Sequence, residues 1–277
     1  MVRPKLENLR EIFMVLRNDA IDVLLREDLG KVAVLTLNRP EARNALSEDM
    51  LSALQNALDE VRDNTSVHVV VLRANGPGFC AGHDIREVLD NHNREYYDAL
   101  FAQCTAMMTS LKQLPVPVIA AVQGSAMGAG AQLAATCDLV VASEAARFAT
   151  PGVNIGLWCS TPMVAVSRSV GQKAAMEMLL TGDMIDAEAA QRFGLVNRVV
   201  PHDSLMDETM ALAEKIASRS RLVVGLGKEA FYRQREMELA DAYSYTSDVM
   251  AHNMMKDDAV EGLNAFLEKR QPGWTNS

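Results

Sequence analysis

Cysteine is scarce in this sequence, and its arrangement suits neither a metal site nor a disulfide framework. The four cysteines lie far apart, without a Cys-x-x-Cys pair or a Cys/His cluster at the spacing of metal ligands: Cys80, Cys104, Cys137 and Cys159. This pattern argues against a zinc ribbon and a disulfide-stapled domain, and it indicates a reducing compartment. We expect no bound metal.

Basic residues are outnumbered, and long apolar runs are lacking. Lys and Arg number 27 against 36 Asp and Glu, which gives a formal net charge of −9. No general basic field exists for nucleic acid or anionic lipid, so we expect neither as a partner, and a local site must hold any anionic ligand. The uncharged stretch 113–137 is broken by prolines and glycines, which argues against a membrane span.

The first residues lack the features of a targeting signal. Met1–Asn18 mixes basic and acidic side chains and has neither an apolar central segment nor a cleavage site of small residues. We therefore expect the cytoplasm of a bacterium, with the mitochondrial matrix as the alternative for a eukaryotic source.

Short apolar runs alternate with helical patterns over the first 150 residues of the 277-residue chain. Strands are predicted at 32–37, 67–72, 118–122 and 138–142, and helices after the cap residue Ser47 and over about 95–114. This order of elements predicts one α/β core.

The last third of the chain is predicted to be mostly helical. Asp186 and Asp203 are the expected N-caps there, and a short strand is expected at 195–200. No linker composition separates this part from the core, so it is either a second domain or an oligomerisation arm.

Two glycine-bearing loops each follow a predicted buried strand and precede a helix. One is Gly76–Asp84, and the other is Gly124–Leu133, with its helix beginning near Ala129. Small residues let the backbone approach a ligand, and the first amides of a helix have no intrahelical acceptor. Two such loops can supply the two backbone donors of an oxyanion hole, although each could equally be a tight packing turn.

The motifs around these loops resemble the crotonase, or enoyl-CoA hydratase/isomerase, superfamily over about residues 20–272. The resemblance rests on segments that occur in the family's order: 38–46 (NRPEARNAL), 79–85 (FCAGHDI), 117–124 (PVIAAVQG), 137–138 (CD), 181–183 (TGD) and 194–197 (GLVN). Gln132-Leu133 together with 148–156 and 159–162 is similar to one branch, that of enoyl-CoA hydratase domain-containing protein 3.

This resemblance implies the α/β crotonase (ClpP-like) fold, a spiral of stacked ββα units with a C-terminal helical trimerisation region. The implied division is an N-terminal extension at 1–19, a spiral core at 20–200 and a helical oligomerisation region at 201–277. The implied assembly is a homotrimer or a dimer of trimers. By position, the backbone amides of His83 and Ala129 form the implied oxyanion hole for a thioester.

The resemblance also implies an acyl-CoA ligand and no separate cofactor, with coenzyme A as part of the substrate. The implied CoA contacts are Ala42, Arg43 and Ala81 at the adenine, and Phe266 and Lys269 from the C-terminal helix of a neighbouring subunit. Many members carry a basic residue where this chain has Glu41, and Arg43 and Arg86 are the expected substitutes.

The sequence departs from a working hydratase of this family at all three acidic positions. The two hydratase glutamates map to Gln132 and Gly152, and a third acid position used by other members maps to Ser160. Gln132 can orient a water at most, because an amide does not titrate near neutral pH. The remaining polar candidates near these positions are His83, Asp84, Asn154, Cys159 and Ser160. We expect Asp84 to cap a helix and Cys159 to be an inert thiol.

Three functions remain open on this sequence. The first is an acyl-CoA enzyme, by family a lyase or isomerase of fatty-acid metabolism, with the oxyanion hole as its main device and weak hydratase activity. The second is a non-catalytic acyl-CoA-binding or regulatory protein. The third is a different thioester reaction, hydrolysis or decarboxylation.

Overall fold

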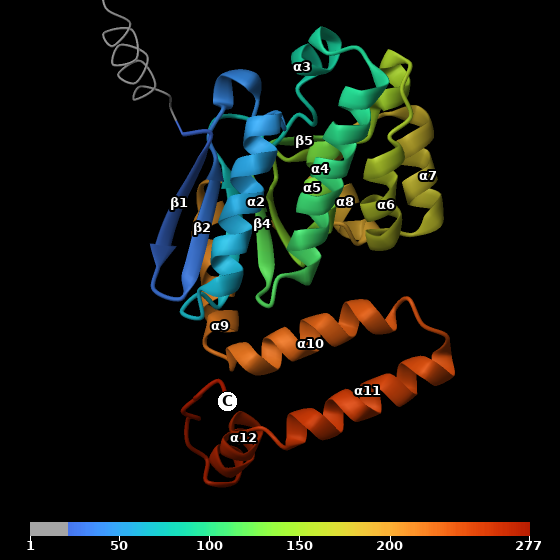
Figure 1. Ribbon diagram of the computed structural model, residues 1–277. Helices are drawn as coiled ribbons and strands as arrows, with labels where there is room; N and C mark the ends of the chain where they lie inside the picture. The colour runs from blue at the N-terminus through green and yellow to red at the C-terminus, as the bar shows by residue number, and fades with distance from the viewer. Residues whose placement is uncertain (1–21) are drawn as a thin grey trace, which may run out of the picture.

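The computed structural model describes residues 22–277, and the predicted extension 1–19 lies outside them. The main sheet has six strands in the order β1-β2-β3-β4-β6-β9 (Figure 1). β1 runs antiparallel to β2, and every other neighbouring pair is parallel. The strands are β1 (Leu24–Leu29), β2 (Val32–Leu37), β3 (Val69–Ala74), β4 (Val118–Val122), β6 (Leu139–Ser143) and β9 (Arg198–Val200).

Both faces of this sheet are buried because its central strands are apolar on both sides. Every residue of β2 and of β4 is buried. One face packs against α2 (Glu48–Asp63) and α4 (Arg94–Gln113), and the other packs against α9 (Leu205–Ala217). A parallel sheet covered in this way explains why its strands read as continuous apolar runs. α9 therefore covers the core although it lies in the predicted region 201–277.

Side-chain caps fix where several helices begin. Ser47 accepts a hydrogen bond from the amide of Met50 at the start of α2, and Asp186 caps α8 (Ala187–Phe193) in the same way. The expectation for Asp203 is wrong. It lies inside the 3-10 turn η3 (His202–Ser204), and α9 then begins at Leu205 without a side-chain cap. The amide of Ser204 bonds instead to the carbonyl of Pro201, which adds one turn before the helix.

A small second sheet joins distant loops beside the main one. It consists of β5 (Ser125–Met127), β7 (Arg147–Ala149) and β8 (Ile185–Asp186), and β7 is its middle strand. The other helices of the core are α3 (Ile85–Asp90), α5 (Ala129–Thr136), α6 (Ser160–Ser169) and α7 (Gln172–Thr181), and its 3-10 turns include η1 (Pro40–Ala42) and η2 (Pro151–Ile155). The glycine turn 124–130 is thereby fixed by strand pairing.

The last three helices form an arm that projects below the core (Figure 1). They are α10 (Arg221–Gln234), α11 (Leu239–Met254) and α12 (Asp257–Leu267). The arm joins the core through a buried ion pair in which Lys228 donates to Asp138 at 2.7 Å, with further bonds to the carbonyls of Leu111 and Val116. Tyr232 donates to the second oxygen of the same carboxylate at 2.7 Å. Among residues 22–277, no helix combines the length and apolarity needed to cross a bilayer.

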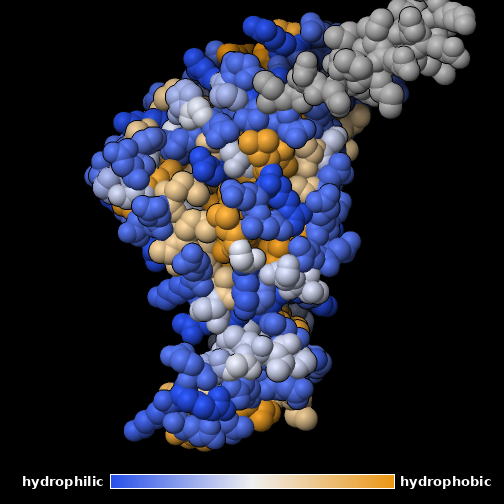
Figure 2. Space-filling view, turned by 90° about the vertical axis from the view of Figure 1, so that its left-hand side faces the viewer, coloured by the Kyte–Doolittle hydropathy of each residue, from blue (hydrophilic) through white to orange (hydrophobic). Residues whose placement is uncertain are grey.

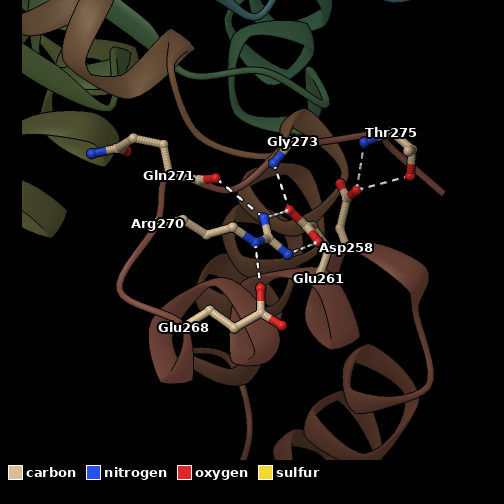
Figure 3. Close-up of polar contacts among 7 residues, drawn as sticks. All are labelled: Asp258, Glu261, Glu268, Arg270, Gln271, Gly273 and Thr275. Atoms are coloured by element: carbon tan, nitrogen blue, oxygen red, sulfur yellow. Dashed lines mark hydrogen bonds and ion pairs between the residues drawn. The ribbon is translucent and has the colours of Figure 1, made fainter.

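The C-terminal tail is held by the buried carboxylate of Asp258 (Figure 3). This carboxylate accepts bonds from the Ser220 hydroxyl and from the amides of Thr275 and Asn276. Burial acts to raise the pKa of Asp258, but these donors outweigh it and the pKa is lowered. Nearby, Arg270 pairs with Glu261 and Glu268, both at 2.6 Å.

We expect Asp258→Asn to destabilise the protein by about 2 kcal/mol at pH 7, the usual scale for hydrogen bonds to a charged group. A lowered folded-state pKa means that the stabilisation is fully present above the unfolded value of about 3.9. It is lost as the pH falls through the lower folded value, so the difference from wild type should shrink below about pH 4. Urea unfolding at several pH values measures this, with exposed Asp257→Asn as the control. Equal stability at pH 7 would contradict the assignment.

Candidate functional site

The two glycine loops predicted to meet lie directly against each other. The amides of Phe79 and Cys80 both donate to the carbonyl of Ser125 at 3.0 Å, and the amide of Met127 donates back to the carbonyl of Cys80 at 2.9 Å. A side chain at Gly130 would collide with the carbonyl of Cys80. The first turn of α5 can therefore approach loop 76–84 this closely only because position 130 has no side chain.

Gly82 and Gly128 shape the point of closest approach. Gly82 has φ +95° and Gly128 has φ +54°, a backbone region that residues other than glycine rarely adopt. A Cβ atom on Gly82 would lie 2.9 Å from the carbonyl oxygen of Met127 and 3.3 Å from the amide nitrogen of Ala129. Loop 76–84 and the start of α5 thus touch at backbone level beside His83 and Ala129.

The amides of His83 and Ala129 are both free to donate. Leu46 donates to the carbonyl of Gly82 at 2.7 Å and accepts from the amide of Asp84 at 3.3 Å, so the N–H of His83 between them points the other way. Ala129 is the first residue of α5, whose opening amides have no intrahelical acceptor. No acceptor for either amide occurs within residues 22–277. The structure thus brings the two predicted donors into one place.

Two amide side chains outside the set of predicted site residues, buried Asn44 and half-buried Gln123, hold loop 76–84 in position. Asn44 is fully buried and donates to the carbonyls of Asn75 (2.8 Å) and Gly78 (3.0 Å). Gln123 donates to the carbonyls of Ala74, Gly76 and Gly78, each at 3.0 Å. Their signal in the sequence is a lone amide beside an apolar segment. We assign both as positioning residues for the His83 amide.

Gln132 lies on α5, three residues after Ala129, and its side chain is 6% exposed. Its carbonyl oxygen Oε1 has no hydrogen-bond partner within the described part of the chain. The residue lines a cavity of about 400 Å³ between α4, α5, α6 and the end of α10. A buried acceptor without a partner is costly, so this oxygen is suited to a donor that arrives with a ligand or a water.

Gly152 is enclosed by its own turn. A Cβ atom there would lie 2.7 Å from the carbonyl oxygen of Leu157 and 2.9 Å from Sγ of Cys159. The amide of Gly152 also donates to that sulfur at 3.3 Å, and its carbonyl accepts from the amide of Leu157 at 2.9 Å. The position that maps to the second glutamate is therefore filled by the turn 157–159, and no free space for a side chain remains there.

The other polar candidates have structural partners. Asp84 caps α3 as expected and also pairs with Arg39 at 3.1 Å. Ser160 begins α6 on the surface, where its hydroxyl lies 3.4 Å from the carbonyl of Trp158. Burial raises the pKa of the Cys159 thiol, which agrees with an inert thiol. Exposed Asn154 lies against Gly182.

The imidazole of His83 is packed beneath the loop. It meets the ring of Phe101 on α4 edge to face, with 5.6 Å between centroids. Burial lowers the pKa of His83 against a smaller opposing effect of the Leu46 backbone, which favours the neutral ring. These observations favour a role through the backbone amide.

The predicted CoA contacts divide into two groups. Ala42, Arg43 and Ala81 lie together, because the amide of Ala81 donates to the carbonyl of Arg43 at 3.1 Å. Arg86 is exposed in the first turn of α3 nearby. Phe266 and Lys269 lie at the end of α12 in the arm, at the opposite end of the molecule from α3 (Figure 1). One chain therefore does not bring the two groups together.

Metal-binding side chains do not gather anywhere in the described part of the chain. No group of three or more His, Cys, Asp or Glu residues between 22 and 277 has a geometry that could hold a metal ion.

Comparison with known proteins finds similarity over nearly the whole chain. Residues 27–277 match the family model described as enoyl-CoA hydratase/isomerase. The enoyl-CoA hydratase domain-containing protein 3, mitochondrial, of Xenopus laevis is 47% identical over 254 residues, covering 92% of this chain and 86% of that protein. The human protein of the same name is 47% identical over 248 residues, covering 90% and 82%. The predicted resemblance to this branch is confirmed.

Solved structures agree on the fold. A structure described as an enoyl-CoA hydratase of Mycobacterium smegmatis has a TM-score of 0.89 and 52% identity, and the match covers 91% of this chain and 98% of that one. The crystal structure of the human enoyl-CoA hydratase domain-containing protein 3 also has a TM-score of 0.89, with 45% identity and coverage of 91% and 100%. The predicted crotonase fold is confirmed.

Proposed function

Because the chain belongs to the enoyl-CoA hydratase/isomerase family, we propose that it binds an acyl-CoA thioester and polarises the thioester carbonyl between the amides of His83 and Ala129. The observation that supports this proposal is the backbone contact at Gly82, beside which the amides of His83 and Ala129 have no acceptor among residues 22–277. Such donors stabilise the negative charge that develops on the oxygen in an enolate or a tetrahedral intermediate.

Efficient hydration is not part of the proposal. General acid and base groups contribute about 10²–10⁴-fold each, whereas one oxyanion donor contributes about 10²–10³-fold. Gln132 cannot exchange a proton, the space at Gly152 is filled, and Ser160 is no acid. The site retains the means to polarise a carbonyl and lacks the usual means to move the protons of hydration.

A binding protein without turnover is the second candidate. The turn 157–159 packed onto Gly152 favours it, because this position is closed to a glutamate side chain without rearrangement of the turn. A different reaction of the same thioester, hydrolysis or decarboxylation, also needs oxyanion stabilisation and neither family glutamate. Product analysis after incubation with acyl-CoA separates these reactions from binding alone.

We further propose the CoA site and the assembly that the family resemblance implies. Ala42, Arg43 and Ala81 would take the adenine, with Arg86 nearby, and Phe266 and Lys269 would act in a neighbouring subunit of a trimer or a dimer of trimers. In support, Phe266 is 82% exposed, and apolar surface lies at the lower end of the arm (Figure 2). The vertebrate relatives, named as mitochondrial, support the matrix alternative, and the bacterial cytoplasm stays a prediction.

Calorimetric titration with hexanoyl-CoA and with free CoA tests the proposed function. We expect hexanoyl-CoA to bind at least about tenfold more tightly, because the acyl chain buries apolar surface in the cavity beside Gln132 and the thioester oxygen gains two donors. Desulfo-CoA serves as a control without the thiol. Equal affinity for hexanoyl-CoA and CoA, or binding of neither, would refute an acyl-thioester site.

A further inference from the structure

The cavity beside Gln132 differs from a site for a purely apolar acyl chain, because three basic side chains line it. Lys112 on α4, Arg168 on α6 and Arg235 after α10 line it, and Glu236 is the one acidic residue among its lining residues. Fixed local charge is therefore positive in a protein whose formal net charge is −9. Such a cavity favours an anion over a neutral group.

The helices connect this basic end to the oxyanion loops. Phe101, Thr105, Met108 and Lys112 follow helical spacing along one stripe of α4, which begins where Phe101 meets the His83 ring and ends at Lys112. On the facing wall, Gln132 and Thr136 lie one turn apart on α5, whose first residue is Ala129. A chain that starts at the two amides and runs past Gln132 therefore leads toward Lys112.

Lys112 has no carboxylate partner in the described part of the chain. Its ammonium lies 4.2 Å from the centroid of the Tyr232 ring, and within residues 22–277 no carboxylate oxygen lies within 4.0 Å of it. The nearby Asp138 is already bonded to Lys228, to Tyr232 and to the amide of Val118. Burial lowers the pKa of Lys112 and outweighs the opposing effect of the Asp138 charge.

The two arginines differ in whether their guanidinium groups have a carboxylate partner. Arg168 pairs with Glu236 at 3.7 Å, which uses the cavity's own carboxylate. Arg235 donates to the carbonyl of Arg168 at 3.1 Å and, among the described residues, has no carboxylate within 4.0 Å. Lys112 and Arg235 are thus the two cations available to an incoming anion.

We propose that the cavity selects acyl-CoA whose acyl chain ends in a carboxylate, and that Lys112 and Arg235 bind this carboxylate while the thioester lies at the His83 and Ala129 amides. This inference rests on the proposed function and adds the substrate class. An alkyl chain alone would leave both cations unpaired in a partly desolvated cavity, whereas an ω-carboxylate pairs with them through charge-assisted hydrogen bonds.

The anionic groups of CoA itself are the rival source of negative charge. The residues proposed for the adenine lie on loops 40–43 and 81–86, near the start of α3, and none of them lines this cavity. The two sources can be distinguished, because a phosphate is present in every CoA ligand and a terminal carboxylate only in dicarboxylic ones.

The test compares hexanoyl-CoA with adipoyl-CoA, which has the same number of acyl carbons, by calorimetric titration. Succinyl-, glutaryl- and suberoyl-CoA extend the series, and the chain length with the largest preference reports the span from the amides to Lys112. We expect adipoyl-CoA, or a dicarboxylic acyl-CoA of neighbouring chain length, to bind at least about tenfold more tightly than the acyl-CoA of the same length without a terminal carboxylate. This is the scale of one hydrogen bond to a charged group.

Lys112→Met should remove this preference, so that the variant binds adipoyl-CoA no more tightly than it binds hexanoyl-CoA. Lys112→Arg should retain the preference, and exposed Lys173→Met should match wild type. Equal binding of the two ligand classes by wild type would overturn the inference, as would a preference that survives in Lys112→Met. If Lys112→Met weakens hexanoyl-CoA as much as adipoyl-CoA, the bound anion is a CoA phosphate and the inference is also overturned. If the proposed function itself is wrong, the result is different: wild type would then bind no acyl-CoA more tightly than free CoA.

Discussion

The protein will hydrate crotonyl-CoA at least about 10⁴-fold more slowly than a family member that carries both glutamates. Each missing acid or base group costs about 10²-fold or more, and the amides of His83 and Ala129 cannot replace proton transfer. The loss of the enoyl absorbance, followed with equal concentrations of the two proteins, measures the rates. A turnover number within tenfold of the two-glutamate protein would contradict the account.

Restoring the glutamates provides a sharper form of this prediction. The sequence alone suggests that Gln132→Glu with Gly152→Glu raises hydration if the pocket is otherwise intact. The structure leaves little space at one of the two positions, because a Cβ atom at position 152 meets the carbonyl of Leu157 and the sulfur of Cys159. We therefore expect Gln132→Glu to be accommodated, since the two side chains are nearly the same size, and the double variant to gain no hydration. A folded double variant that binds hexanoyl-CoA and hydrates crotonyl-CoA faster would show that the turn 157–159 yields.

Replacement of Gly82 by alanine will remove the polarisation of a bound thioester. The new Cβ atom meets the backbone at Met127 and Ala129, and neither of these backbone atoms can move away as a flexible side chain could. The two loops must separate, which misplaces one amide, and loss of a single oxyanion donor costs about 10²–10³-fold in any reaction that uses the hole.

Gly30→Ala is the matched control for this variant. Gly30 has φ +60° in the turn between β1 and β2, and a Cβ atom there meets nothing within 4 Å. Both variants have the strain of a side chain at positive φ, about 1 kcal/mol, but only Gly82→Ala disturbs the amides. An equal infrared carbonyl stretch of a bound thioester in the two variants would refute the role of the Gly82 contact.

Much of the core could be predicted from the sequence because burial on both faces leaves a strong apolar signal. Strands 32–37 and 118–122 have the predicted bounds, whereas the strand predicted at 67–72 spans Val69–Ala74. β1 has no such signal, since this edge strand is largely exposed and charged. β5 and β7 have three residues each, too few for a periodic pattern.

The candidate site also has features that the sequence predicts and features that it does not. The meeting of the two glycine loops follows from local chemistry, since small residues and helix starts are visible in the chain. The closure of Gly152 is not visible, because it depends on how the turn 157–159 folds back. The charges of the cavity are not visible either, because Lys112, Arg168 and Arg235 come from three helical segments far apart in sequence.

The carbonyl stretch of a bound thioester tests the central claim most directly. Hexanoyl-CoA labelled with ¹³C at the thioester carbon is bound to the protein, and difference infrared spectra isolate that carbonyl. Two amide donors at the oxygen predict a stretch at lower wavenumber than in water for wild type and for Gly30→Ala, and a return toward the solution value for Gly82→Ala. A bound carbonyl at the solution wavenumber in wild type would contradict the proposal that His83 and Ala129 form an oxyanion hole.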